Sequence, residues 1–217
     1  REQGLPYPSQ PMGANFGDLD NDGFLDFYLA TGDVYYSELR PNVMFLNKSG
    51  TGFENVTMAG GFGHLQKGHG VSFADLDNDG DQDVYVQMGG AYPGDKYSDA
   101  LFENPGFGNR WITVKLEGRS SNRSAIGARI HVRVKEGERE RSIYRHVNSG
   151  GSFGCNPLRQ TVGLGKADEI LFLEITWPAT GNAQRFNAVD LDQAIHCVEG
   201  ESSYTTLELA RFKIGGK

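Results

Sequence analysis

Short apolar stretches alternate with turn-forming residues along the first half of the chain. Each stretch is rich in Phe, Tyr, Leu or Val, and Gly, Asn, Asp or Pro stand between them. Aromatic and β-branched residues in runs this short, bounded by turn formers, are typical of β-strands. The pattern predicts strands at Gly13 to Gly17, Phe24 to Ala30, Val43 to Asn47 and Phe53 to Thr57.

In the second half of the chain, turn-forming residues again separate apolar stretches, which are somewhat longer. Alternating or continuous apolar character over five to ten residues again indicates strands. We expect a compact antiparallel β domain, sandwich-like, built from Trp111 to Gly118, Ala128 to Lys135, Arg141 to Val147, Glu169 to Pro178 and Gln193 to Gly200.

An internal repeat organises the first half. The segment from Gly13 to Gly23 matches the segment from Gly70 to Gly80 at an offset of 57 residues, and Val43 to Asn47 falls on Ala100 to Asn104 at the same offset. The four strands of the first copy should therefore have counterparts in the second. Four strands in about 40 to 60 residues is the size of a propeller blade. The predicted fold is all-β, with a partial β-propeller of two blades over residues 1–107 and a small β domain over residues 108–217.

Composition and charge limit the kinds of partner. The chain has 217 residues, is 38% hydrophobic and carries a formal net charge of -7. It has no apolar run long enough for a membrane span, so we expect no membrane insertion. We also expect no nucleic-acid partner, because no basic stripe is present to neutralise phosphates. The sequence begins at Arg1 without an initiator methionine or a signal peptide, so we expect a piece of a longer protein.

Much of the negative charge is concentrated in two short loops. Both follow the pattern D-x-D-x-D-G-x-x-D, with a glycine at the sharp turn. Alternating carboxylates on a chain that curls around an ion supply the hard oxygen ligands that Ca²⁺ prefers, and a backbone carbonyl after the glycine adds another. The predicted ligands are the side chains of Asp18, Asp20, Asp22 and Asp26 with the carbonyl of Phe24, and the side chains of Asp75, Asp77, Asp79 and Asp83 with the carbonyl of Asp81.

These loops differ from an EF-hand. An EF-hand needs a bidentate glutamate at its twelfth position and helices on both sides, whereas here that position is Leu29 or Val86 and the flanks are strand-like. The alternative is a pair of aspartate-rich β-turns that need no metal. Two copies with identical carboxylate spacing favour two structural Ca²⁺ ions.

The residues also carry a family resemblance. The stretches "FGDLDNDGFLDFYLATG" and "FADLDNDGDQDVYVQMGG" resemble the calcium-binding blades of FG-GAP/VCBS repeats. The segments "SNRSAIGARIHV", "GGSFGCNPLRQTVGLG" and "LEITWPATG" resemble the ASPIC/UnbV domain, which follows such repeats in the cartilage acidic protein-like family. The resemblance implies a calcium-stabilised protein that is secreted, exposed at the cell surface or periplasmic. It also implies further propeller blades in the parent chain, because two blades do not close a propeller.

Histidines and cysteines raise an alternative function. His64 and His69 lie in a glycine-rich loop before the second aspartate loop, and the glycine-rich segment from Asn148 to Pro157 contains Cys155. An enzyme or metal-dependent catalyst could use the His64/His69 loop together with the Gly150 to Cys155 loop, which would require these residues to meet in one pocket. Cys155 and Cys197 could instead form one disulfide or stay free thiols.

The favoured hypothesis is a non-enzymatic, calcium-binding adhesion or binding module. Its partner would be a protein or a carbohydrate, and the sequence does not name it. No motif for a hydrolase nucleophile, a zinc protease, a phosphate-binding loop or a dinucleotide site is present.

Overall fold

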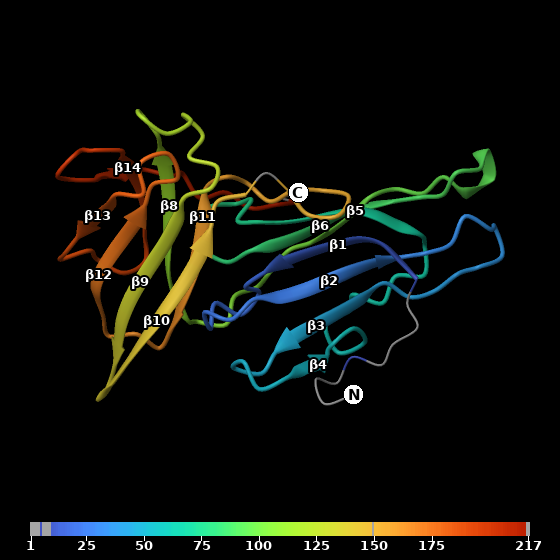
Figure 1. Cartoon of the computed structure of the whole chain (residues 1–217). Coiled ribbons are helices and arrows are strands. Elements are labelled where there is room, and N and C mark those ends of the chain that lie inside the picture. The colour runs from blue at the N-terminus through green and yellow to red at the C-terminus, as the bar shows by residue number, and fades with distance from the viewer. Residues whose placement is uncertain (1–4, 6–9, 149, 216–217) are drawn as a thin grey trace.

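The computed structural model describes Leu5 and residues 10–148 and 150–215, so the first part of the predicted 1–107 range lies partly outside the described residues. The fold is all-β, as predicted. Among the described residues the one helical element is the 3₁₀ turn Pro93–Asp95. No helix in this part of the chain has the length and hydropathy to cross a bilayer. Figure 1 shows the N-terminal repeats on one side and the C-terminal strands on the other.

The first repeat forms a complete four-stranded blade. Its strands pair in sequence order, each antiparallel to the next, and they coincide with the predicted stretches to within about two residues at most ends. They are β1 (Pro11–Gly17), β2 (Asp26–Thr31), β3 (Val43–Asn47) and β4 (Phe53–Asn55).

The second repeat forms a blade with one strand fewer than predicted. Its sheet contains β5 (Gly68–Ala74), β6 (Asp83–Met88) and β7 (Ala100–Phe102). The counterpart of β4 falls at residues 110–114, which belong to β8 (Arg110–Glu117), and this strand pairs within a different sheet. The residues expected to form the fourth strand of the second blade therefore belong to β8, which pairs with strands of the C-terminal half.

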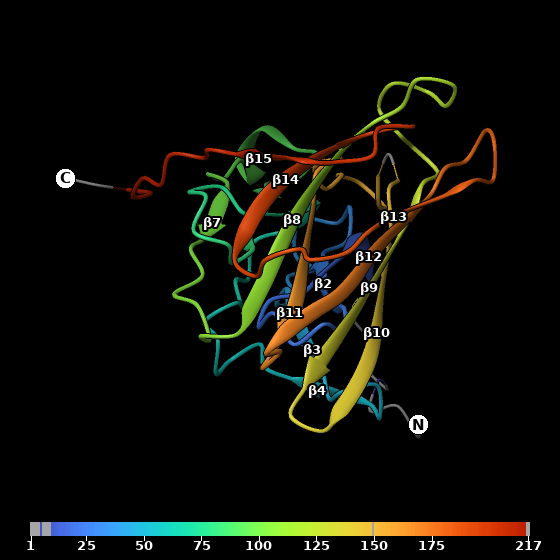
Figure 2. The ribbon, with the colours of Figure 1, turned by 90° about the vertical axis from the view of Figure 1, so that its left-hand side faces the viewer.

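The C-terminal strands form two four-stranded sheets packed as a sandwich, which Figure 2 shows from the side. One sheet has the order β10-β9-β12-β13 and the other the order β11-β8-β14-β15. The bounds are β9 (Arg129–Glu136), β10 (Arg139–His146), β11 (Gln160–Gly165), β12 (Glu169–Thr176), β13 (Ala183–Phe186), β14 (Gln193–Val198) and β15 (Thr205–Leu207).

Two details of this sandwich differ from the expectation. The domain is antiparallel as predicted except for one pair, because β14 runs parallel to β8. The long connection through the other sheet permits this pairing, which a tight hairpin could not make. The strands β11, β13 and β15 were also not expected. β13 and β15 are short edge strands with few apolar residues, and β11 is interrupted by glycines.

The apolar residues separate into two clusters. The cluster of the repeats contains Tyr28 and Met44 from the first blade and Phe73 and Val84 from the second, so the two blades share one core. The cluster of the sandwich runs from Ile112 to Cys197 and is filled from both of its sheets. Both aspartate loops lie where the repeats meet the sandwich, and arginines of the sandwich form hydrogen bonds with them.

Candidate metal centre

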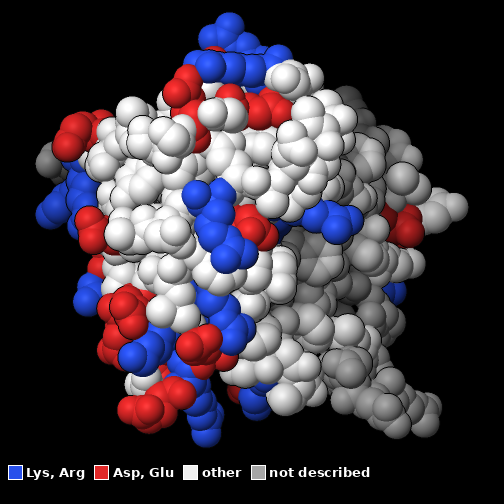
Figure 3. Space-filling view, turned by 60° about the vertical axis from the view of Figure 1, so that its left-hand side comes forward, with Lys and Arg blue, Asp and Glu red and all other residues white. Residues whose placement is uncertain are grey.

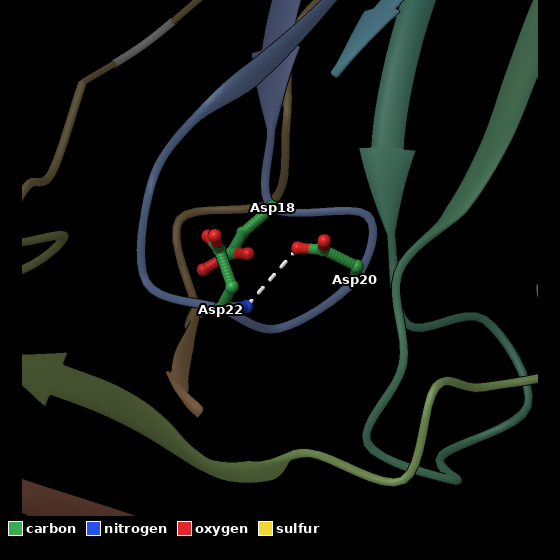
Figure 4. Close-up of side chains that lie close together, drawn as sticks. All are labelled: Asp18, Asp20 and Asp22. Carbon is green, nitrogen blue, oxygen red and sulfur yellow. Dashed lines mark hydrogen bonds between the residues drawn. The ribbon is translucent and has the colours of Figure 1, made fainter. Parts of the chain in front are cut away.

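Each aspartate loop joins the first two strands of its blade. The loop between β1 and β2 brings together Asp18, Asp20 and Asp22, and Figure 4 shows their carboxylates converging inside the curl of the backbone. The loop between β5 and β6 does the same with Asp75, Asp77 and Asp79. In both groups one oxygen from each residue lies within 4.8 Å of those of the other two. Three of the four predicted side-chain ligands therefore converge in each loop.

The tight curl requires backbone conformations that favour Asn and Gly. In the first loop Asn21 has φ 56° and Gly23 has φ 96°, and in the second Asn78 has φ 62° and Gly80 has φ 100°. Asn and Gly tolerate this left-handed region better than other residues. The sequence D-N-D-G is thus required by the path of the loop as well as by its charge.

The fourth aspartate of each loop closes the loop at its base. Asp26 accepts backbone hydrogen bonds from Leu19 at 2.7 Å and from Asn47 at 2.7 Å. Asp83 accepts the equivalent bonds from Leu76 at 3.1 Å and from Asn104 at 2.8 Å. Both carboxylates lie outside the groups of three, and metal ligation by Asp26 and Asp83 stays a prediction.

The predicted backbone ligands lie at the same point in each loop. The N–H of Phe24 donates to Asp22 Oδ1 at 2.8 Å, and the N–H of Asp81 donates to Asp79 Oδ1 at 2.9 Å. The Asp81 side chain accepts a 2.8 Å hydrogen bond from Asn21 Nδ2, which links the two loops. The roles of the Phe24 and Asp81 carbonyls stay predictions.

Both loops contain buried carboxylate oxygens without hydrogen-bond partners. Among the described residues, the buried side-chain atoms that lack a partner include Asp18 Oδ1, Asp75 Oδ1 and Asp77 Oδ1. An unsatisfied buried acceptor is costly, and more so when it carries charge. The residues present therefore fit a hard cation with oxygen ligands, which would satisfy these atoms.

The protein alone does not neutralise this charge. Burial raises the pKa of Asp18 to about 7, although the nearby Arg145 lowers it. Burial likewise raises the pKa of Asp26 to about 8, against the backbone hydrogen bonds from Asn47 and Leu19. The pKa values of Asp81 and Asp83 are raised to about 6, again chiefly by burial. Without a cation, burial therefore disfavours the ionised form of these carboxyls.

Arginines of the sandwich reach the first loop, which sequence reasoning did not anticipate. Arg145 Nη2 donates to Asp18 Oδ2 at 2.6 Å, and both side chains are buried. Arg141 Nη1 donates to the carbonyl of Asp22 at 2.7 Å. The backbone N–H of Gly165 donates to the carbonyl of Asn21 at 2.8 Å.

The second loop is held by the sandwich in a similar way. Arg159 Nη2 donates to the carbonyl of Asp75 at 3.2 Å, and the backbone N–H of Phe212 donates to the carbonyl of Asp77 at 3.1 Å. Gly80 lies so close to the ring of Trp111 that a Cβ there would clash with it. Both loops therefore form the joint between the repeats and the sandwich.

Family models match both halves of the chain. Residues 18–86 match the FG-GAP-like repeat, and residues 118–204 match the family described as ASPIC and UnbV. The chain combines FG-GAP-like repeats with an ASPIC/UnbV domain. No curated protein matches the chain, and membership of the cartilage acidic protein-like family stays a prediction.

The histidines and cysteines considered for catalysis have separate surroundings. His64, in the FG-GAP-like repeats, packs edge-on against Tyr97 at 5.0 Å between ring centroids, and His69 Nε2 forms a 2.5 Å hydrogen bond with the carbonyl of Gly89. Cys155 is an exposed free thiol, and Cys197 is a buried free thiol of the ASPIC/UnbV domain whose pKa burial raises to about 12. Within the described residues, no hydrogen bond or ring contact joins His64, His69 and Cys155.

The loop that contains Cys155 has a structural role. Ser152 exchanges two backbone hydrogen bonds with Ala14 of β1, at 3.0 and 3.1 Å. Asn156 donates to the carbonyl of Phe16 at 2.7 Å and accepts from the N–H of Phe73 at 2.8 Å. Ser149 in this loop lies outside the described residues. The glycine-rich segment thus fastens the ASPIC/UnbV domain to both blades.

Proposed function

We propose that the two aspartate loops each bind one Ca²⁺ ion and that these ions are structural. The observation that carries the proposal is the convergence of three carboxylates in each loop, with buried oxygens that have no other partner. A bound cation would supply the missing positive charge and hold the curl of each loop.

The chemistry of the ligands favours calcium over other cations. The groups contain carboxylates and no His or Cys, which argues against Zn²⁺ and Cu²⁺. Ca²⁺ accepts six to eight oxygen ligands in a flexible geometry, whereas Mg²⁺ requires a near-ideal octahedron. Loops of alternating aspartates with added backbone carbonyls suit the larger ion.

The position of the loops supports a structural role. Both loops contact the ASPIC/UnbV domain through Arg145, Arg141 and Arg159. An ion that orders a loop therefore also orders the surface of the repeats that contacts the ASPIC/UnbV domain. We infer a non-enzymatic, extracellular binding or adhesion module, part of a larger repeat protein, whose rigidity depends on calcium.

Calcium titration by isothermal calorimetry tests this proposal. We expect two sites in the wild type and one in Asp20→Asn or Asp77→Asn, because each variant removes a charged ligand from one loop. Asp190→Asn, at an exposed position before β14, is the matched control and should keep both sites. A wild type that binds no calcium at millimolar concentration would overturn the proposal. So would loop variants that bind like the control.

A further inference from the structure

A cavity lies between the first blade and the ASPIC/UnbV domain. Its volume is about 830 Å³, within the range of pockets that enclose small ligands. One wall is the end of β1, from Ala14 to Gly17, and the other is the end of β10, from Tyr144 to His146. Figure 1 shows β10 on the side of its domain that faces the repeats.

The charged side chains that line the cavity are basic, whereas the whole protein is acidic. Among the described residues, the lining contains Arg129, Arg145 and His146 and no Asp or Glu, although the chain carries a net charge of -7. On the outer face drawn in Figure 3, basic and acidic side chains are interspersed. The absence of acidic side chains is therefore a local property of this cavity, and it favours an anionic ligand.

Arg129 is the cation available to such a ligand. Arg145 is committed to Asp18 and to the carbonyls of Gly23 and Tyr144. Arg129 is exposed, and no ion pair holds its guanidinium within the described residues. A guanidinium binds a carboxylate through two parallel hydrogen bonds.

Exposed aromatic rings stand on both sides of the cavity. Phe16 of the first blade is 52% exposed and Tyr144 of β10 is 62% exposed. The ring of His131 stacks on that of Tyr144 at 4.4 Å between centroids. The aromatic rings offer apolar contact and the nearby cation offers polar contact. A sugar ring presents both kinds of surface, so it suits this arrangement.

The strand edges beside the cavity argue against a peptide ligand. A peptide that added as a strand would need free backbone groups along an edge. Both backbone groups of Ala14 are bonded to Ser152, and the carbonyl of Tyr144 accepts from its neighbour Arg145 at 3.0 Å. Recognition in this cavity therefore depends on side chains.

We propose that this cavity binds an anionic saccharide, with a uronate carboxylate on Arg129 and sugar rings against Phe16 and Tyr144. The inference rests on the proposed binding function and names its site and the chemical class of its ligand. It adds a role for the boundary between repeats and ASPIC/UnbV domain, which would hold both the calcium loops and the ligand.

The test is calorimetric titration of the calcium-loaded protein with a hyaluronan tetrasaccharide, which alternates glucuronate and N-acetylglucosamine. Chitotetraose is the neutral comparison. We expect the uronate-containing ligand to bind the wild type at least about tenfold more tightly than the neutral one. Arg129→Gln should weaken its binding at least about tenfold, because a charge-assisted contact is lost. Arg139→Gln, at an exposed arginine at the start of β10, should change it less than about twofold.

The calcium titration of the same samples separates the two proposals. Two calcium sites without saccharide binding would overturn the ligand inference and leave the metal proposal intact. Saccharide binding by a protein that shows no calcium sites would overturn the metal proposal and leave the ligand inference intact. Equal binding of the neutral ligand, or equal weakening by Arg129→Gln and Arg139→Gln, would also overturn the inference. Preferential binding of an acidic peptide would contradict the assignment to a saccharide.

Discussion

Arg145 of β10 donates a 2.6 Å hydrogen bond to Asp18, the first aspartate of the first loop, across the boundary between the repeats and the ASPIC/UnbV domain. Their side chains are only 7% and 1% exposed. A buried pair of this kind contributes little net stability over an apolar pair, but loss of one partner leaves an uncompensated charge. The pair therefore makes the first loop and the sandwich depend on each other.

Replacement of Arg145 by methionine should destabilise the protein strongly. We expect the free energy of unfolding to fall by about 3 to 5 kcal/mol, because Asp18 loses its cationic partner in a buried site. Urea unfolding followed by tryptophan fluorescence measures the change. Arg139→Met, on the exposed start of the same strand, is the control and should stay within about 0.5 kcal/mol of wild type. Equal stability of the two variants would show that the pair does not hold the boundary.

A methyl group at Gly80 should disturb the second loop. Gly80 has φ 100°, and its Cα faces the Trp111 ring of β8. We expect Gly80→Ala to lower the free energy of unfolding by about 2 kcal/mol or more, through backbone strain and a clash. Gly52→Ala is the control, since a Cβ there meets nothing within 4 Å. If the two substitutions had the same effect, the close packing of Trp111 on this loop would be refuted.

The attachment of the glycine-rich segment, residues 148–157, to the two blades should depend on Asn156. Its amide bonds Phe16, Phe73 and Asn15, which belong to both blades. We expect Asn156→Ala to cost about 1 to 3 kcal/mol, because it leaves buried partners without a hydrogen bond. Limited proteolysis should then cut this loop faster than in wild type. Asn148→Ala, whose side chain makes only local bonds, should not show that change. Equal cleavage rates would contradict the fastening role.

The strands and loops of the repeats could be predicted because they depend on patterns over a few neighbouring residues. The positions of β1 to β3 and of both aspartate loops follow from apolar runs, turn residues and the 57-residue offset. The loop-closing bonds even repeat at that offset, since Leu19 and Asn47 correspond to Leu76 and Asn104. Strand pairing and turn chemistry over a few residues determine these features.

Contacts across the boundary could not be predicted in this way. Nothing near Arg145 in the sequence identifies Asp18, 127 residues away, as its partner. The parallel pairing of β14 with β8 likewise depends on the path of the chain through the other sheet. A basic residue on the apolar face of a strand, between Ile143 and Val147, is the one signal that could have pointed to a buried ion pair.

The most direct test of the account is thermal unfolding of the wild type in millimolar calcium and in excess chelator. Ions that bind only the folded state increase the free energy of unfolding by mass action, by about 2.7 kcal/mol per site at a free concentration one hundred times the dissociation constant, and so raise the midpoint temperature. We predict a midpoint several degrees higher in calcium, with the difference reduced in Asp20→Asn and Asp77→Asn and retained in Asp190→Asn. A wild-type midpoint that is the same in calcium and in chelator would contradict the claim that the two loops bind structural calcium.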